Sequence, residues 1–256
     1  MTHVPSSTPL THFKACSFDV LGTLIDWETG MYNSLTSLAP ISTLPSNHPM
    51  RHRKTLLQAT EACERNIQLA NPAMEYSLLL AQTFKTLCKE QNLHDAHIEE
   101  NSALFAKSIE HWPAFPDTLQ GLRKLKRYIP LLFPLSNSSP GTLGPCLVNA
   151  FPGFEFTDVY TAAEIGSYKP DLRNFVYLLE RVRGDYGVGK DELLHVAQSL
   201  FHDHEPAGQM GIESVWVDRG GAMGDLKPGT VGRYNWEVES IGAFADLVEK
   251  AFEGKE

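Results

Sequence analysis

The chain has 256 residues, of which 42% are hydrophobic, so it is long enough to bury one large core or a core with a smaller companion domain. Its formal net charge of −9 is spread without a basic stripe, which argues against nucleic acid or an anionic membrane as the main partner. No stretch approaches the roughly 18 apolar residues of a membrane span, and the polar start MTHVPSSTPLTHF lacks the apolar core of a signal peptide.

The cysteines are too far apart to suggest a zinc site or a disulfide framework; they are Cys16, Cys63, Cys88 and Cys146. Reduced thiols fit a cytoplasmic protein. We therefore expect a soluble cytoplasmic chain whose first ten residues are frayed.

The first predicted element is a strand in FKACSFDVL, which starts at Phe13 and ends in a GT turn. Long helical patterns follow in HRKTLLQATEACERNIQLA and EYSLLLAQTFKTLCKEQNL, where apolar residues recur every three or four positions. This segment has few β-branched runs, and it predicts a helical cap inserted after the first strand.

Four later segments are again apolar runs that end in small or polar residues, at 129–139, 156–162, 193–199 and 214–220. Helical patterns separate them at 117–128, 171–187 and 204–212, and a glycine-rich loop at 220–236 precedes a last helix at 239–252. This alternation predicts a doubly wound, Rossmann-like α/β fold with a parallel sheet. We expect a core domain at 11–27 and 114–256 and a helical cap domain at 28–113.

Ligands of such sheets bind outside the carboxyl ends of the strands, where polar residues of this chain gather. Each residue also has a plainer explanation, since Asp19 and the SNSSPG segment are typical of turns and a lysine before a proline usually faces solvent. Asp203 fits a helix cap, and its histidine neighbours are only a weak indication of metal. The residues expected at the strand ends are Asp19, Ser136, Asn137 and the 197–203 stretch with Asp203, whereas Lys169 precedes Pro170 and is expected at the start of a helix.

Together, SFDVLGTLIDW, LSNSS, SYKPD and HVAQSLFHDHEPA resemble the four motifs of the haloacid dehalogenase superfamily. The chain is most similar to the L-2-haloacid dehalogenases (type II) and their dehalogenase-like relatives. The resemblance covers the predicted core on both sides of the helical segment, and in the cap it is diffuse.

Two departures from the phosphatases of this superfamily point to chemistry at carbon. Phosphatases carry a second aspartate two residues after the first, to protonate the leaving alcohol, whereas this chain has Leu21. They also commonly carry an acid after the fourth strand to hold Mg²⁺, whereas this chain has Ala197 and Gln198. A halide leaving group needs no proton, so we expect metal-independent dehalogenation with no cofactor.

The resemblance implies that Asp19 attacks the carbon that bears the halogen, and that water then hydrolyses the resulting ester to a 2-hydroxy acid. In this scheme Asp203 orients the water and Lys169 pairs with Asp19 or the substrate. Ser136 and Asn137 hold the substrate carboxylate. The remaining pocket residues are Leu21, Thr23, Ser199 and His202.

The same resemblance exposes differences that bear on the substrate. Phe175 and Leu21 stand where the relatives usually have tyrosine, and SLFHDH is one residue longer, so Ser199, His202 and Asp203 compete for the fourth motif's roles. The relatives also place a cap arginine over the substrate. Candidates for it are Arg51, Arg53 and Arg65, of which Arg65 is our choice.

Three functions follow, and the first is hydrolytic dehalogenation of a small 2-haloalkanoic acid. The second is hydrolysis of a phosphate ester or another carbonyl substrate, which Leu21 disfavours. The third is a non-catalytic member that binds a carboxylate metabolite or a protein, which the complete set of motif residues disfavours. A homodimer is expected because relatives in this family often form dimers.

Overall fold

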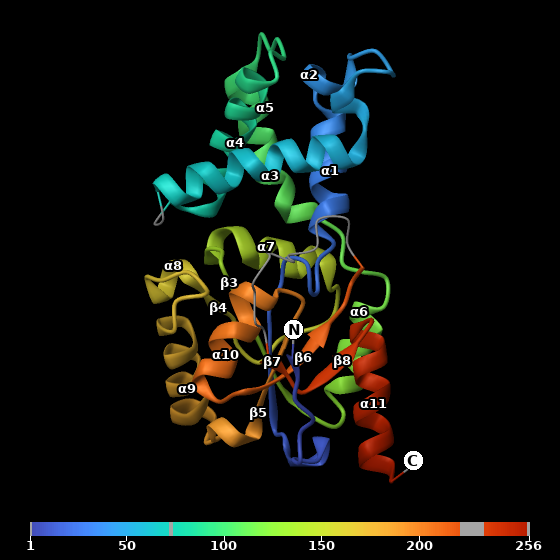
Figure 1. The fold of residues 1–256 in the computed structure, drawn as a ribbon, viewed down its shortest axis with the longest axis vertical. Coiled ribbons are helices and arrows are strands. Elements are labelled where there is room, and N and C mark those ends of the chain that lie inside the picture. The colour runs from blue at the N-terminus through green and yellow to red at the C-terminus, as the bar shows by residue number, and fades with distance from the viewer. Residues whose placement is uncertain (1, 72–73, 221–232, 255–256) are drawn as a thin grey trace. The chain divides into compact units, whose positions relative to one another are not determined.

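Residues 2–71, 74–220 and 233–254 are described by a computed structural model (Figure 1). The chain forms two units, which we describe separately. The α/β unit takes residues 1–25, 114–137 and 151–256, and the helical unit takes 26–113 and 138–150. The domain limits predicted from the sequence stay a prediction.

Six parallel strands form the main sheet of the α/β unit, in the order β4-β3-β2-β5-β6-β8. They are β2 (Ala15–Phe18), β3 (Leu131–Ser136), β4 (Tyr160–Thr161), β5 (Leu193–Ala197), β6 (Glu213–Val217) and β8 (Trp236–Val238). Every residue of β2 and β5 is buried, as expected for strands covered on both faces. The predicted doubly wound α/β fold is confirmed.

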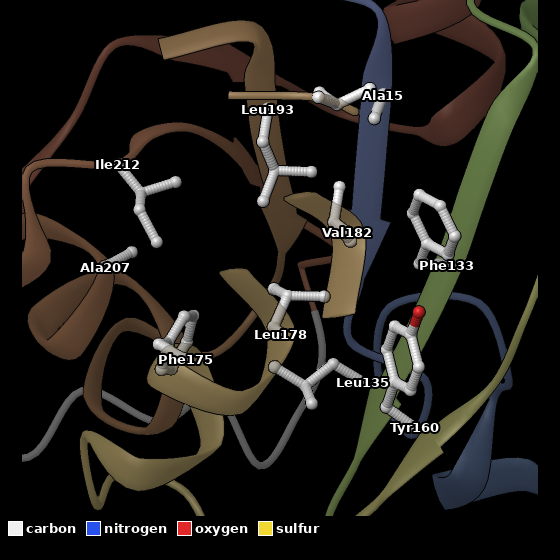
Figure 2. Packing of buried hydrophobic residues seen from close by; sticks show 11 residues of the cluster. Ala15, Phe133, Leu135, Tyr160, Phe175, Leu178, Val182, Leu193, Ala207 and Ile212 are labelled. Carbon is white, nitrogen blue, oxygen red and sulfur yellow. The ribbon is translucent and has the colours of Figure 1, made fainter. Parts of the chain in front are cut away.

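Helices cover this sheet on both sides, with α9 and α10 on one side and α6 and α11 on the other (Figure 1). The helices of the unit are α6 (Thr118–Leu125), α8 (Ala162–Ile165), α9 (Arg173–Tyr186), α10 (Glu205–Met210) and α11 (Ile241–Glu253). Figure 2 shows how α9 packs on the sheet: Phe175, Leu178 and Val182, spaced by three and four residues, belong to one cluster with Phe133 and Leu193.

The helical unit contains α1 (Trp27–Ser37), α2 (Ala39–Ser42), α3 (Arg53–Ala70), α4 (Tyr76–Glu90), α5 (Ile98–Lys107) and α7 (Pro140–Ala150). Helix α4 packs against both α3 and α5, and the rings of Phe84 and Phe105 lie 5.9 Å apart between α4 and α5. Helix α1 carries Gly30 because the Trp112 ring occupies the space of a side chain, only 2.3 Å from where a Cβ would stand. The cap helices predicted from the sequence are therefore present.

Glu75 joins α7 to α4 within the helical unit. Its carboxylate caps α4 and accepts hydrogen bonds from Ser139 Oγ at 2.6 Å and Thr142 Oγ1 at 3.1 Å. Burial raises the pKa of Glu75, but the hydrogen bonds from Ser139 and Ser77 outweigh it, so the pKa is lowered. The start of α7 is thus held by an ionised carboxylate.

Some local predictions are wrong. The N-terminus is not frayed throughout, because β1 (Thr2–His3) pairs in parallel with β7 (Arg233–Tyr234), and Leu10 is buried. The strand predicted at 156–162 is only the two residues of β4. In the predicted loop at 220–236, residues 221–232 lie outside the described residues, whereas β7 and the start of β8 show that its end is extended and paired.

The remaining predictions concern short turns, thiols and membrane spans. Turns of 3-10 helix lie at Leu10–His12, Pro49–Arg51, Ser108–His111 and Lys190–Glu192. The four cysteines are buried and free, as expected of reduced thiols. None of the helices in the described ranges is long and apolar enough to cross a membrane.

Candidate active site

The polar ends of three neighbouring strands meet at one edge of the α/β unit. Asp19 directly follows β2, Ser136 closes β3, and Asp203 follows β5 by six residues. All three are buried, with Asp19 the most exposed at 8%. Because parallel strands end at the same edge of a sheet, their order brings together residues that are far apart in the sequence.

Lys169 joins the two carboxylates. Its Nζ donates to Asp19 Oδ1 at 2.8 Å, to Asp203 Oδ1 at 2.7 Å and to the Leu135 carbonyl at 2.9 Å. An ammonium has three N–H donors, so each has an acceptor. Burial lowers the pKa of Lys169, but the charges of Asp19 and Asp203 raise it by a larger amount. The net shift of the pKa is upward, so the side chain stays charged.

The structure corrects the predicted surroundings of Lys169. The residue does not begin a helix, since α9 starts four residues later at Arg173, and its side chain does not face solvent. Its backbone is held by the Asn137 side chain, which accepts from Lys169 N at 2.6 Å and donates to Lys169 O at 3.0 Å. The Asn137 amide is therefore engaged in placing the lysine, and its predicted contact with substrate stays a prediction.

Asp19 is held by Thr23 on the side away from the lysine. Thr23 Oγ1 donates to Asp19 Oδ2 at 2.7 Å and accepts from the Gln198 backbone N at 2.9 Å. Burial raises the pKa of the Asp19 carboxyl, and the Asp203 charge adds to this rise against the opposing effect of Lys169. Each oxygen of the Asp19 carboxylate thus accepts one hydrogen bond, Oδ1 from Lys169 and Oδ2 from Thr23. These two bonds fix the orientation of the carboxylate, as a nucleophile requires.

Arg219, which the sequence analysis did not single out, holds the loop that carries Thr23. Its guanidinium donates to the Thr23 carbonyl from two nitrogens, at 3.1 and 2.8 Å, and to Asp117 Oδ1 at 2.6 Å. It also lies 4.0 Å from the centre of the Phe115 ring. A lone arginine after an apolar strand gives little signal in the sequence, because its partners are about a hundred or more residues away.

Asp203 lies in a π-helical turn, Leu200–His204, and is fully buried. Its Oδ1 accepts from Lys169 and lies 2.9 Å from Nε2 of His195, a residue that the sequence analysis also missed. Burial raises the pKa of Asp203, but the Lys169 charge and the His195 hydrogen bond lower it more. The pKa of this carboxyl therefore lies well below its usual range, and the carboxyl is ionised. A histidine inside the apolar run LLHVA was the available signal, since a buried imidazole needs partners.

The other predicted residues of this unit lie in the turns that follow β2 and β5. Ser199 begins the turn, and its Oγ accepts from the His202 backbone N at 3.1 Å, so it caps the turn that leads to Asp203. Leu21 is partly buried in the turn after Asp19 and pairs with Ile25 through a backbone bridge. Their roles toward substrate stay predictions.

The candidate cap arginines lie in the helical unit. Arg65 pairs with Glu61 on its own helix at 2.5 Å and its side chain is 52% exposed. Arg53 donates to Thr29 Oγ1 at 3.0 Å and covers the Tyr32 ring, while Arg51 donates to backbone carbonyls at 41 and 42. The choice of Arg65 as the substrate-binding arginine stays a prediction.

The side chains at the strand ends do not fit a magnesium site. Among the residues that the structure describes, two carboxylates meet there, those of Asp19 and Asp203, and Lys169 already bridges them. In the described part of the chain, no group of three or more His, Cys, Asp or Glu side chains is placed to hold a metal ion. Mg²⁺ prefers near-octahedral oxygen ligation, which this set does not supply from side chains.

Comparison with known proteins places the chain in a family. The family model for haloacid dehalogenase-like hydrolase matches residues 13–197, well over half of the chain. The chain belongs to the haloacid dehalogenase-like hydrolases.

Individual relatives are more distant. A phosphoserine phosphatase of Thermus thermophilus is 27% identical over 156 residues, covering 59% of this chain and 61% of the relative. An (S)-2-haloacid dehalogenase of Pseudomonas putida is 27% identical over 151 residues, covering 56% and 64%. The matches thus span less than two thirds of these relatives, and they include two different activities.

Solved structures show the fold over a longer stretch. The structure of a defluorinating L-2-haloacid dehalogenase aligns with a TM-score of 0.75 at 20% identity, covering 96% of this chain and all of that chain. At this identity the likeness establishes the haloacid dehalogenase fold of this hydrolase and leaves its substrate to chemical argument.

Proposed function

We propose that this hydrolase removes halide from small 2-haloalkanoic acids, as an (S)-2-haloacid dehalogenase does. The observation that carries the proposal is an oriented, buried Asp19 whose neighbour two positions on is Leu21, a side chain that cannot donate a proton. A carboxylate nucleophile without a nearby acid suits a leaving group that departs as a stable anion.

In the first step, Asp19 attacks the carbon that bears the halogen, a C–O bond forms as the C–halogen bond breaks, and halide leaves. Lys169 and Thr23 orient the attacking carboxylate through their hydrogen bonds. We assign Ser136 and Asn137 to the substrate carboxylate, and Leu21, Ser199, His202 and a cap arginine such as Arg65 to the rest of the pocket.

In the second step, water adds to the carboxyl carbon of the Asp19 ester, with Asp203 orienting it. The bond between the substrate carbon and the Asp19 oxygen, made by in-line displacement in the first step, is not broken in the second. The hydroxy acid therefore keeps the inverted configuration that the first step produced. Asp19 is regenerated with an oxygen from water, and one proton is released overall with each halide.

Phosphate ester hydrolysis is the second candidate, because one of the relatives is a phosphoserine phosphatase. It would require an acid other than residue 21 to protonate the leaving alcohol. A non-catalytic carboxylate-binding role, a homodimeric state and a cytoplasmic location stay predictions.

The deciding experiment measures halide release from each enantiomer of 2-chloro- and 2-bromopropionate, and from haloacetates, in EDTA. Phosphate release from an aryl phosphate with Mg²⁺ is measured in parallel. We expect EDTA-resistant halide release with one enantiomer preferred and a product of inverted configuration. Phosphate release without halide release would contradict the proposal. The absence of both products would also contradict it.

A further inference from the structure

A line of buried polar groups runs from the middle of the sheet to Asp203 and includes two residues without a role in the chemistry above. Ser17 Oγ lies 2.8 Å from His195 Nδ1, and His195 Nε2 lies 2.9 Å from Asp203 Oδ1. Ser17, His195 and Asp203 are each 0% exposed. Ser17 and His195 are register partners of β2 and β5, so the sheet itself sets their contact.

The surroundings determine which nitrogen of His195 donates to Asp203. Asp203 Oδ1 belongs to an ionised carboxylate and only accepts, so Nε2 must donate to it. Nδ1, on the other side of the ring, is held by its hydrogen bond with the Ser17 hydroxyl. The edge-on Phe175 ring, 5.1 Å away, packs against the imidazole and limits its rotation.

Both donors of Asp203 converge on one oxygen. Lys169 and His195 bind Oδ1, while Oδ2 is buried and has no hydrogen-bond partner among the residues that the structure describes. A buried carboxylate oxygen without a partner costs free energy, so a site of this kind is expected to bind a polar molecule there. A water molecule is the smallest that fits this need.

We propose that His195, backed by Ser17, is a positioning residue that turns Asp203 so that Oδ2 receives the hydrolytic water. The inference rests on the proposed function, because it concerns hydrolysis of the Asp19 ester. It assigns His195 to the second step only, since Asp19 is oriented by Lys169 and Thr23 and makes no contact with His195 in the hydrogen bonds described.

The proton balance of this step closes on Asp203. Water forms a bond to the carboxyl carbon of Asp19 while one of its protons moves to Asp203 Oδ2. When the tetrahedral intermediate collapses, the bond from that carbon to the substrate oxygen breaks, and Asp203 returns the proton to this oxygen to give the hydroxy acid. The new Asp19 carboxyl then loses its proton to solvent.

The test replaces His195 with Phe, which keeps an aromatic ring and removes the donor to Asp203. Each protein is mixed with 2-bromopropionate and quenched, and the peptide that contains Asp19 is weighed by mass spectrometry. We expect His195→Phe to release about one halide per site and then accumulate the Asp19 ester, because hydrolysis slows roughly 10-fold or more. His195→Gln, which restores an N–H donor, should recover part of the hydrolysis.

His204→Gln is the matched control, because His204 is also a fully buried histidine but binds Ser214 and the Ala197 carbonyl instead of Asp203. It should not accumulate the ester. The inference is overturned if His195→Phe hydrolyses the ester at the normal rate, if it loses the first step as well, or if His204→Gln accumulates ester equally.

A second measurement needs no substrate and therefore separates this inference from the proposed function. Nitrogen-15 NMR of the wild-type protein should show a proton on Nε2 of His195, and Ser17→Ala should shift the Nδ1 signal. An Nε2 that carries no proton would overturn the inference whatever the enzyme's substrate. No adduct and no halide from the wild type, with the expected NMR result, would instead reject only the proposed function.

Discussion

Lys169 is the residue on which the site depends most, because a buried ammonium between two carboxylates leaves a net charge of −1 in a poorly hydrated place. This excess is tolerable because every N–H of the lysine is used and Thr23 and His195 supply further donors. The same arrangement makes Asp19 and Asp203 unequal, since only Asp19 has any contact with solvent.

Asp19→Asn is the direct test of nucleophilic catalysis at the residue scale. Substitution should lower turnover by roughly 10³-fold or more while the fold remains intact, because an amide is a poor nucleophile of nearly the same volume. Initial rates of halide release and circular dichroism measure the two effects. Asp171→Asn, at an exposed position, is the control and should keep its activity; an active Asp19→Asn enzyme would exclude Asp19 as the nucleophile.

At the scale of elements, the turn after β5 and the loop after β2 are each held by a side chain from elsewhere. The turn Leu200–His204 is π-helical, so its coil is wider than that of an α-helix. Asp203 lies within this turn, and its Oδ1 accepts from Lys169. The loop after β2 depends on Arg219, which binds the Thr23 carbonyl and Asp117 together.

Arg219→Lys tests this second support. A lysine has one nitrogen and no planar fork, so it cannot keep both the Thr23 and the Asp117 contacts of a side chain that is only 6% exposed. We expect a loss of about 2 kcal/mol in the free energy of unfolding and slower halide release. Urea denaturation measures the stability. Arg173→Lys, at a pair whose arginine is 69% exposed, is the control; equal midpoints for both variants would show that Arg219 does not support the loop.

At the scale of the whole molecule, pH acts on folding through a buried histidine outside the proposed chemistry. Burial lowers the pKa of His204 to about 4, from 6.5 in the unfolded chain. Between these values the unfolded state binds more protons than the folded state, so stability rises with pH in this window. Carboxyl groups whose pKa is lowered by folding, such as those of Asp117 and Asp203, stabilise the folded state in their ionised form. This contribution is lost only at lower pH, where they become protonated.

The prediction is that the free energy of unfolding falls by about 2 kcal/mol on going from neutral pH to pH 5 because of His204 alone. Urea denaturation across this range checks it. In His204→Gln, which cannot titrate, this part of the pH dependence should disappear. A variant with the wild-type slope would assign the dependence to other groups.

The parallel sheet and the nearness of Asp19 to the segment that holds Asp203 could be predicted from the sequence, because strands covered on both faces give unbroken apolar runs and their polar ends share an edge. The pairing of Lys169 with Asp19 was implied only by the family resemblance, and its contact with Asp203 was not predicted. Strands β1, β7 and β8 have two or three residues each and are too short to show a period. His195 was missed because its partner Ser17 is 178 positions away and is placed beside it only by the register of β2 and β5.

The bond between Ser139 and Glu75 has a consequence for the order in which the chain folds during synthesis. The two residues are 64 positions apart, and β3 is made between them. Helix α4 therefore leaves the ribosome with Glu75 lacking its α7 donors, and the helical unit is complete only after the ribosome has added α7. Because contacts of this separation close late, the cap helices must wait for part of the sheet's own sequence before their packing is finished.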